Sequence, residues 1–214
     1  MIDAREEWGR AVFWHYLSEV FMDVPNSSII EQTRELLPLI EEFEGDKAER
    51  AAKLLRSFLE ECNNLPAAAI EEQLNICYTA LFDLNAPVFM SESPWLSPEG
   101  LIMQEPWEQV KLTYKAFSFT KPKTFHEPDD HIGLEFLFLA ALSGAIADLL
   151  EKKPEDYETA AANLRAGKKR FLERHLGKWI NSFAAAVFTK GSPLNLYAGA
   201  AFFGAAMVEL ESTE

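Results

Sequence analysis

The range from Ile132 to Leu150 is the feature that most restricts how this chain can fold. Its twelve residues from Phe136 to Ala147 carry no formal charge, and the whole range is apolar apart from a few small or acidic side chains. A helix that is apolar on nearly every face is stable in water only when other helices cover it. The range therefore predicts the central helix of a helical bundle.

An acidic segment leads directly into this helix. It reads Glu127, Pro128, Asp129, Asp130, His131. Proline suits the first helical position, because its missing N–H would be unpaired there, and carboxylates are favoured at the positive end of the helix dipole. We therefore expect the helix to begin at Pro128. With helical spacing from there, Glu135 lies one turn after His131, so carboxylates are expected on both sides of the imidazole.

Helical periodicity recurs along the rest of the N-terminal part. Apolar residues return every three or four positions from Lys47 to Cys62, and again after Pro66. Three pairs of residues fit the capping box, in which a cap side chain and the third helical residue satisfy each other's free amides. These pairs are Asp3 with Glu6, Ser28 with Glu31, and Asp46 with Glu49. Each pair predicts the start of a helix.

Two segments lack this periodicity. Asn85 to Glu105 contains three prolines and a glycine together with several large apolar residues, which predicts an ordered loop that packs over a groove. Residues 118–127 are expected to be a hinge. The predicted fold is an all-α bundle of about eight to ten helices in one domain, residues 1–214, with helical halves at 1–117 and 128–214 on either side of the hinge.

The C-terminal part predicts three further helices. Pro154 begins a segment through Leu164, Gly167 is expected to break or bend it, and a helix follows from Lys168 to Thr189. Arg170, Arg174 and Lys178 recur at a spacing of four and predict a solvated face, whereas His175 is expected to be a satisfied core histidine. After Pro193, a helix containing Gly199 and Gly204 is expected to contact other helices closely.

The composition excludes several classes of function. The formal net charge is −14, which argues against binding to nucleic acid or to anionic membranes and favours a cationic partner or simple solubility. Cys62 and Cys77 have no metal-ligand spacing and are expected to be reduced core residues. The acidic N-terminus has no apolar secretory region, and the longest charge-free run, residues 191–208, has only about 13 apolar residues, short of the ~20 that a bilayer needs, so no segment is expected to span a membrane. We therefore expect a cytoplasmic protein without stable membrane insertion.

Three blocks of residues resemble one family. The run Glu127-Pro128-Asp129-Asp130-His131, followed by Glu135, is similar to the hallmark of the TorD/DmsD-type chaperones. Tyr78, Leu81, Phe82 and Pro87, with the stretches 91–95 and 100–103, resemble the family's first conserved block, and residues 171–179 resemble its C-terminal helix. The blocks occur in the family's order over roughly residues 78–183. Trp95 departs from the pattern, because many relatives have tyrosine there.

The resemblance implies a cytoplasmic chaperone rather than an enzyme. The implied partner is the precursor of a molybdenum-containing oxidoreductase, held through its twin-arginine signal peptide or its apo-enzyme body until the cofactor is inserted. The protein is then expected to be a monomer or a domain-swapped dimer with no cofactor, and guanine nucleotide binding is implied by the family alone. The residues expected to contact the client are Leu81, Phe82, Pro87, Trp95, Glu127, Asp130 and His131.

The residues themselves leave alternatives open. An imidazole oriented by carboxylates can do acid–base work, so a small helical enzyme using His131 with Asp130 and Glu135 is the alternative function. His126 could join these residues around a metal ion, but their spacing matches no recognised metal site. Asp130 could either line the client groove and pair with an arginine, or clamp the hinge to the central helix. We expect the groove for Asp130 and a mixed role for His131.

Overall fold

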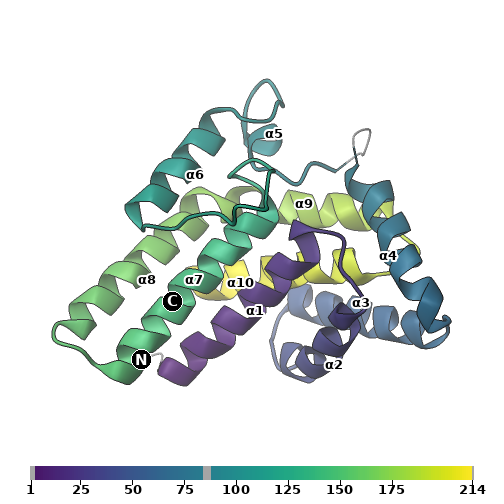
Figure 1. Cartoon of the computed structure of the whole chain (residues 1–214), viewed down its shortest axis with the longest axis horizontal. Helices are drawn as coiled ribbons and strands as arrows, with labels where there is room; N and C mark the ends of the chain where they lie inside the picture. The colour runs from purple at the N-terminus through teal and green to yellow at the C-terminus, as the bar shows by residue number, and fades with distance from the viewer. Residues whose placement is uncertain (1–2, 84–87, 214) are drawn as a thin grey trace.

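The computed structural model describes residues 3–83 and 88–213, and within these ranges it contains ten helices and no strand. The helices form one bundle (Figure 1), which confirms the predicted all-α fold. Their bounds are α1 Ala4–Met22, α2 Ser28–Ile40, α3 Asp46–Asn63, α4 Ala67–Phe82, α5 Ser93–Leu96, α6 Glu105–Ala116, α7 Ile132–Lys152, α8 Tyr157–Arg174, α9 Leu176–Lys190 and α10 Leu196–Thr213.

Helix α7 is the buried central helix that the apolar stretch predicted. Helix α1 lies along it in the opposite direction (Figure 1), with Met22 at the end of α1 against Gly133 and Trp8 near its start against Gly144. By length and composition α7 could cross a membrane, but its most apolar window is 67% buried inside the protein. Its apolar surface is thus already covered by neighbouring helices.

The C-terminal helix α10 packs closely against its neighbours α3 and α9. A Cβ atom added at Gly199 would lie 2.8 Å from two carbon atoms of the Leu55 side chain, and one at Gly204 would lie 2.9 Å from the ring of Phe136. Separations this short leave no room for a side chain. The predicted close helix contact at these two glycines is therefore confirmed.

A buried polar network joins the two ends of the chain. The indole Nε1 of Trp14 donates to Glu211 Oε1 at 2.8 Å, and Lys168 pairs with both Glu211 and Glu7. All four side chains are at most a few per cent exposed. Buried charges are tolerated when they are paired in this way, so the network fixes α1, α8 and α10 relative to one another.

The predicted start of the central helix at Pro128 is wrong. Helix α7 begins at Ile132 with His131 as its N-cap. Pro128 lies in a turn before it, and the carbonyl of Pro128 accepts from the N–H of His131 at 3.1 Å. The backbone is extended here because it pairs with the loop before α5: Glu92 N–H donates to the Asp130 carbonyl at 2.9 Å, and Ile132 N–H donates to the Met90 carbonyl at 2.7 Å. This long-range pairing outweighs the local preference for a helix start.

Only one of the three predicted capping boxes has a capping hydrogen bond from its side chain. Asp3 accepts from the N–H of Glu6 at 3.0 Å, as expected. Ser28 is instead the first residue of α2, where its own N–H donates to the Asn26 side chain at 2.8 Å. Asp46 is likewise inside its helix, because Gly45, at φ 106°, occupies the cap position.

The break between the last long helices lies at His175 and not at Gly167, so that prediction is also wrong. Helix α8 continues through Gly167, where the ring of Phe117 packs so closely that an added Cβ would lie 2.0 Å from it. His175 has φ −119° and ψ −101° and separates α8 from α9. Gly167 thus allows α8 to pack closely against Phe117 at the end of α6, and the chain turns instead at His175.

Other features agree with the sequence-based expectations. Cys62 and Cys77 are free and buried, and Arg170, Arg174 and Lys178 are exposed. Within the predicted hinge, Phe119 packs with its ring 4.9 Å from that of Tyr114 and 5.2 Å from that of Phe138. The use of residues 118–127 as a hinge stays a prediction.

Candidate functional site

Asp130 holds the loop before α6 in place. Its carboxylate is fully buried, and Oδ2 accepts from both the N–H and the hydroxyl of Ser93, at 2.8 Å and 2.6 Å. Burial raises the pKa of the Asp130 carboxyl, while the two bonds from Ser93 counteract that rise. Ser93 is the first residue of the short helix α5, so Asp130 fixes where α5 begins. The clamp alternative joins the hinge to the central helix, whereas these bonds join the loop at Ser93 to the start of α7.

His131 is a buried cap and does not lie between carboxylates. Its Nδ1 accepts from the N–H of Gly133 at 3.2 Å, and its ring packs edge-on against Phe125 at 5.1 Å. Complete burial, with a smaller contribution from Lys121, lowers the pKa of His131 to about 3, so the imidazole is neutral. A ring that is only 2% exposed offers no surface to a substrate, and the acid–base alternative gains no support here.

A second histidine ties the same loop to the C-terminal helices. The Nδ1 of His175 lies 3.2 Å from each carboxylate oxygen of Glu92. Glu92 is 1% exposed and precedes α5, while His175 stands at the break between α8 and α9. The contact confirms that His175 is a satisfied histidine, and it anchors α5 to the point where the chain turns.

Glu135 completes a buried group of three carboxyls with Glu92 and Asp130. Burial first, and then the neighbouring carboxylates of Glu92 and Asp130, raise the pKa of Glu135 well above its usual range. The neutral acid is therefore the favoured form in the folded protein. In the described residues, no group of three or more His, Cys, Asp or Glu side chains is arranged to hold a metal ion.

Replacing Glu135 by glutamine should make the protein more stable at pH 7. A carboxyl with a raised folded-state pKa contributes stability that is fully present below its unfolded pKa and is lost as the pH rises through its folded pKa. The neutral amide avoids that loss, so the advantage of Glu135→Gln should shrink as the pH falls toward 4. Urea unfolding at several pH values measures it, and the exposed Glu60→Gln is the control. An advantage that is independent of pH would contradict the assignment.

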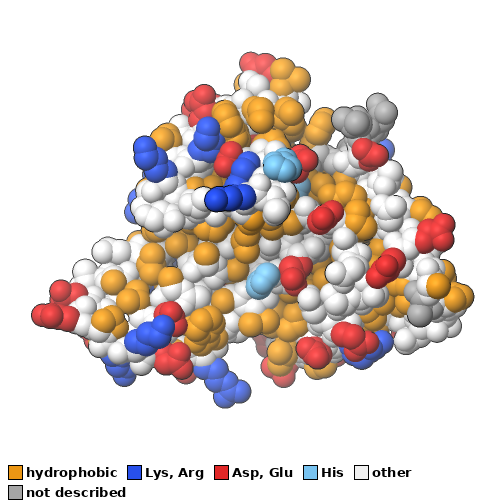
Figure 2. All heavy atoms as spheres, in the orientation of Figure 1, with side chains coloured by type: hydrophobic (Ala, Val, Ile, Leu, Met, Phe, Trp, Pro, Cys, Tyr) orange, Lys and Arg blue, Asp and Glu red, His pale blue; other side chains and the backbone are white. Residues whose placement is uncertain are grey.

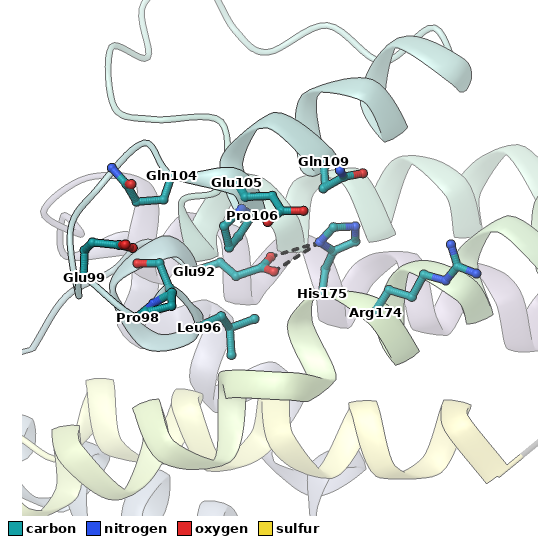
Figure 3. A pocket seen from close by; sticks show the side chains of 11 residues that line it. Glu92, Leu96, Pro98, Glu99, Gln104, Glu105, Pro106, Gln109, Arg174 and His175 are labelled. Carbon is teal, nitrogen blue, oxygen red and sulfur yellow. Dashed lines mark hydrogen bonds and ion pairs between the residues drawn. The ribbon is translucent and has the colours of Figure 1, made fainter.

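An acidic pocket opens over the Glu92–His175 pair. Its volume is about 450 Å³, and the carboxylates of Glu92, Glu99 and Glu105 line it together with one guanidinium, that of Arg174. Figure 3 shows Glu92 pointing toward His175, with Glu99 and Glu105 contributed by the loop after α5 and by the first turn of α6. Three carboxylates against one cation make the pocket suited to a positively charged group.

The loop that lines this pocket also carries exposed apolar residues. Leu101, Ile102 and Met103 follow Glu99 in the same loop and are 58%, 51% and 50% exposed, and Leu96 on the pocket wall is 38% exposed. Figure 2 shows hydrophobic side chains gathered at this end of the molecule. A second cavity of about 430 Å³ continues from the pocket between α6 and α8, and the two share Gln109, Arg174 and His175. Contiguous exposed apolar residues of this kind mark binding surfaces.

The residues predicted to contact the client lie in different surroundings. Asp130, His131 and Leu81 are buried, whereas Glu127 is exposed. Pro87 lies outside the described residues.

Phe82 and Trp95 are half-buried and belong to one aromatic cluster, with rings 6.2 Å and 6.4 Å from that of Phe183. None of the described residues among those predicted lines the acidic pocket.

The pocket residues Glu99, Glu105 and His175 were not foreseen as a site. Glu92 and Ser93 stand inside the block that carries the family resemblance, which is the signal that could have drawn attention to this loop. Their spacing in the sequence does not reveal the pocket, because α6 and the α8–α9 break approach the loop only in the folded chain.

The fold and this loop define an all-helical protein with an acidic pocket at the end of the bundle that carries α5 and α6. The model of a family described as "Nitrate reductase delta subunit" matches residues 40–185, more than half of the chain. The chain therefore belongs to the nitrate reductase delta subunit family, which is a family of chaperones for molybdoenzyme maturation. The resemblance inferred from the motifs is confirmed. No curated protein matches the chain significantly.

Proposed function

We propose that the protein is a cytoplasmic chaperone that binds the precursor of a molybdenum-containing oxidoreductase and holds it until the cofactor is inserted, before export or assembly. The proposed contact is the precursor's twin-arginine signal peptide, which combines paired guanidinium groups with an apolar stretch. The observation that supports this proposal most is the acidic pocket, which is lined in part by the loop that Asp130 holds and that carries the exposed residues Leu101, Ile102 and Met103.

The charges of the pocket suit an arginine. A guanidinium can make two parallel hydrogen bonds to one carboxylate, and Glu99 and Glu105 are both exposed and available for such bonds. Glu92 lies deeper and is held by His175. A peptide whose arginine enters here would place its following apolar residues near the exposed side chains of Leu101, Ile102 and Met103.

The predicted client-contact residues take distinct roles in this proposal. Asp130 and His131 are buried and do not contact the peptide directly. Asp130 fixes the loop at Ser93, and His131 caps the start of α7. Phe82 and Trp95 belong to the half-buried aromatic cluster beside the loop and supply apolar contact area. Glu127 offers a further exposed carboxylate.

Peptide binding to the purified full chain tests the proposal. The probe is a synthetic peptide with an arginine pair followed by about a dozen apolar residues, and calorimetry measures its affinity. The double variant Glu99→Gln/Glu105→Gln should weaken binding about tenfold, since each exposed ion pair contributes up to about 1 kcal/mol. Binding should also weaken between 0.1 M and 1 M salt, where the Debye length falls from about 10 Å to about 3 Å.

The matched control removes two negative charges at positions outside the pocket. Glu60 on α3 and Glu72 on α4 are exposed carboxylates outside the pocket, and Glu60→Gln/Glu72→Gln should leave the affinity nearly unchanged. An equal loss of peptide affinity in both double variants would mean that binding depends only on the overall charge of the protein. Unchanged affinity in the pocket variant would exclude the pocket as the arginine site.

A further inference from the structure

The largest cavity described in the structure lies away from the family motif. It has a volume of about 1070 Å³ and is formed by α1, the connection between α2 and α3, and the last turns of α10. Figure 1 shows α2 and α3 at the end of the molecule opposite α5 and α6. The lining of this groove shares no residue with that of the acidic pocket.

The floor of the groove is apolar and rigid. Phe13 and Phe43 meet edge-on with ring centroids 5.4 Å apart, and Phe43 packs in the same way against Phe203 at 5.4 Å. Leu39 and Leu210 line the groove from α2 and α10 and are 47% and 38% exposed. Interlocked aromatic rings hold the shape of the floor, while the two leucines present apolar surface to whatever enters.

The rim of the groove is acidic. Glu42 and Glu44 line it from the connection between α2 and α3, and Asp46 lines it from the start of α3. Among the described residues none of the three has an ion-pair partner within 4.0 Å. The other two carboxylates of the lining are already paired: Glu6 lies 3.1 Å from an Arg10 nitrogen, and Glu209 lies 3.2 Å from the Lys47 nitrogen. Arg5 also lines the groove, and three carboxylates without an ion-pair partner against this one further cation leave the rim negative.

From the apolar floor and the acidic rim we infer that this groove is a second docking surface, which binds a helix that is apolar on one face and carries lysine or arginine beside that face. A helix laid in a groove contributes apolar anchors one turn apart, and its flanking cations would meet Glu42, Glu44 and Asp46. The same carboxylates disfavour the other apolar occupants. An anionic bilayer would be repelled, and so would a second copy of a chain with net charge −14.

A designed peptide tests the surface in the full-length protein. The probe is an 18-residue helix of leucine, alanine and lysine with one apolar stripe and lysines beside it, and fluorescence anisotropy measures its binding. Leu39→Gln and Leu210→Gln, changed singly, should each weaken binding at least tenfold. Both side chains are partly exposed, so the fold is retained. Ile76→Gln is the matched control, because Ile76 is 45% exposed on α4 and lies outside the groove.

Charge reversal separates this proposal from simple apolar adhesion. The double variant Glu42→Lys/Glu44→Lys should bind the lysine peptide more weakly than the parent does. It should bind a matched peptide, with glutamates in place of the lysines, more tightly. Equal binding of the two peptides, or equal binding by all variants, would overturn the proposal. So would a dimer, or binding to anionic vesicles, that Leu39→Gln abolishes. The arginine-pair peptide should bind every groove variant normally, so failure at the groove and failure at the acidic pocket are distinguishable.

Discussion

Replacing Asp130 by alanine is expected to lower the free energy of unfolding by about 2 to 4 kcal/mol. The change removes two hydrogen bonds to a carboxylate and leaves the buried N–H and hydroxyl of Ser93 without this acceptor. Because the bonds hold the start of α5, the loop that carries Glu92 and Glu99 should lose its position as well. Arginine-pair peptide binding should therefore fall together with stability, as urea unfolding and calorimetry on the same variant would record.

Two further variants make this result specific. Asp130→Asn keeps a side-chain oxygen for a Ser93 donor and should recover part of both losses. Glu127→Ala removes an exposed carboxylate three positions earlier in the motif and should change the stability by no more than about 0.5 kcal/mol. An Asp130→Ala protein that unfolds like the parent and binds the peptide fully would show that the clamp is dispensable.

Lowering the pH should destabilise the protein through His131. The unfolded histidine takes up a proton near its ordinary pKa of 6.5, whereas burial lowers the pKa of folded His131 to about 3. The unfolded state therefore binds the extra proton between these values, and the stability that is present above pH 6.5 is lost as the pH falls. The contribution of this one group is a slope of about 1.4 kcal/mol per pH unit.

The variant His131→Asn isolates that slope. Asparagine caps a helix well and offers an oxygen to the N–H of Gly133 in place of Nδ1, but it does not titrate. The difference in stability between parent and variant, measured by urea unfolding at pH 7, 6, 5 and 4, should shift by about 1.4 kcal/mol for each unit below 6.5. His126→Asn, at an exposed histidine, is measured in parallel as the control. A flat difference for His131→Asn would mean that the folded protein protonates this ring.

The sequence predicts elements whose apolar residues recur locally. Helix α3 begins and ends close to its predicted bounds, α4 begins directly after Pro66 as predicted, and the prediction that α7 is central follows from its lack of a polar face. The exceptions have long-range causes. Helix α7 starts later than expected because Met90 and Glu92 pair with the backbone before it, and α8 ends at His175, whose ring is held by Glu92.

The candidate site could be predicted only in part. The motif around Asp130 drew attention to the loop that this residue holds, but the expected groove position of Asp130 and the mixed role of His131 did not anticipate that both side chains are buried. Whether these residues influence client binding stays a prediction. Glu99 and Glu105 look like any other acidic residues in a chain that has 34 of them, and only their approach to Arg174 and His175 in the folded protein distinguishes them.

The buried bond between Trp14 and Glu211 has a consequence for how the chain reaches its native state during synthesis. The first helix finds its main partners in α7 and α10, and the two residues of this bond are 197 positions apart. While the ribosome is still making the second half, the part of α1 that packs against α7 and α10 has no partner. Folding of the core must therefore wait until α10 has emerged, because contacts of such large sequence separation cannot form earlier. A chaperone built in this way passes through a vulnerable, incomplete state of its own before it can protect another protein.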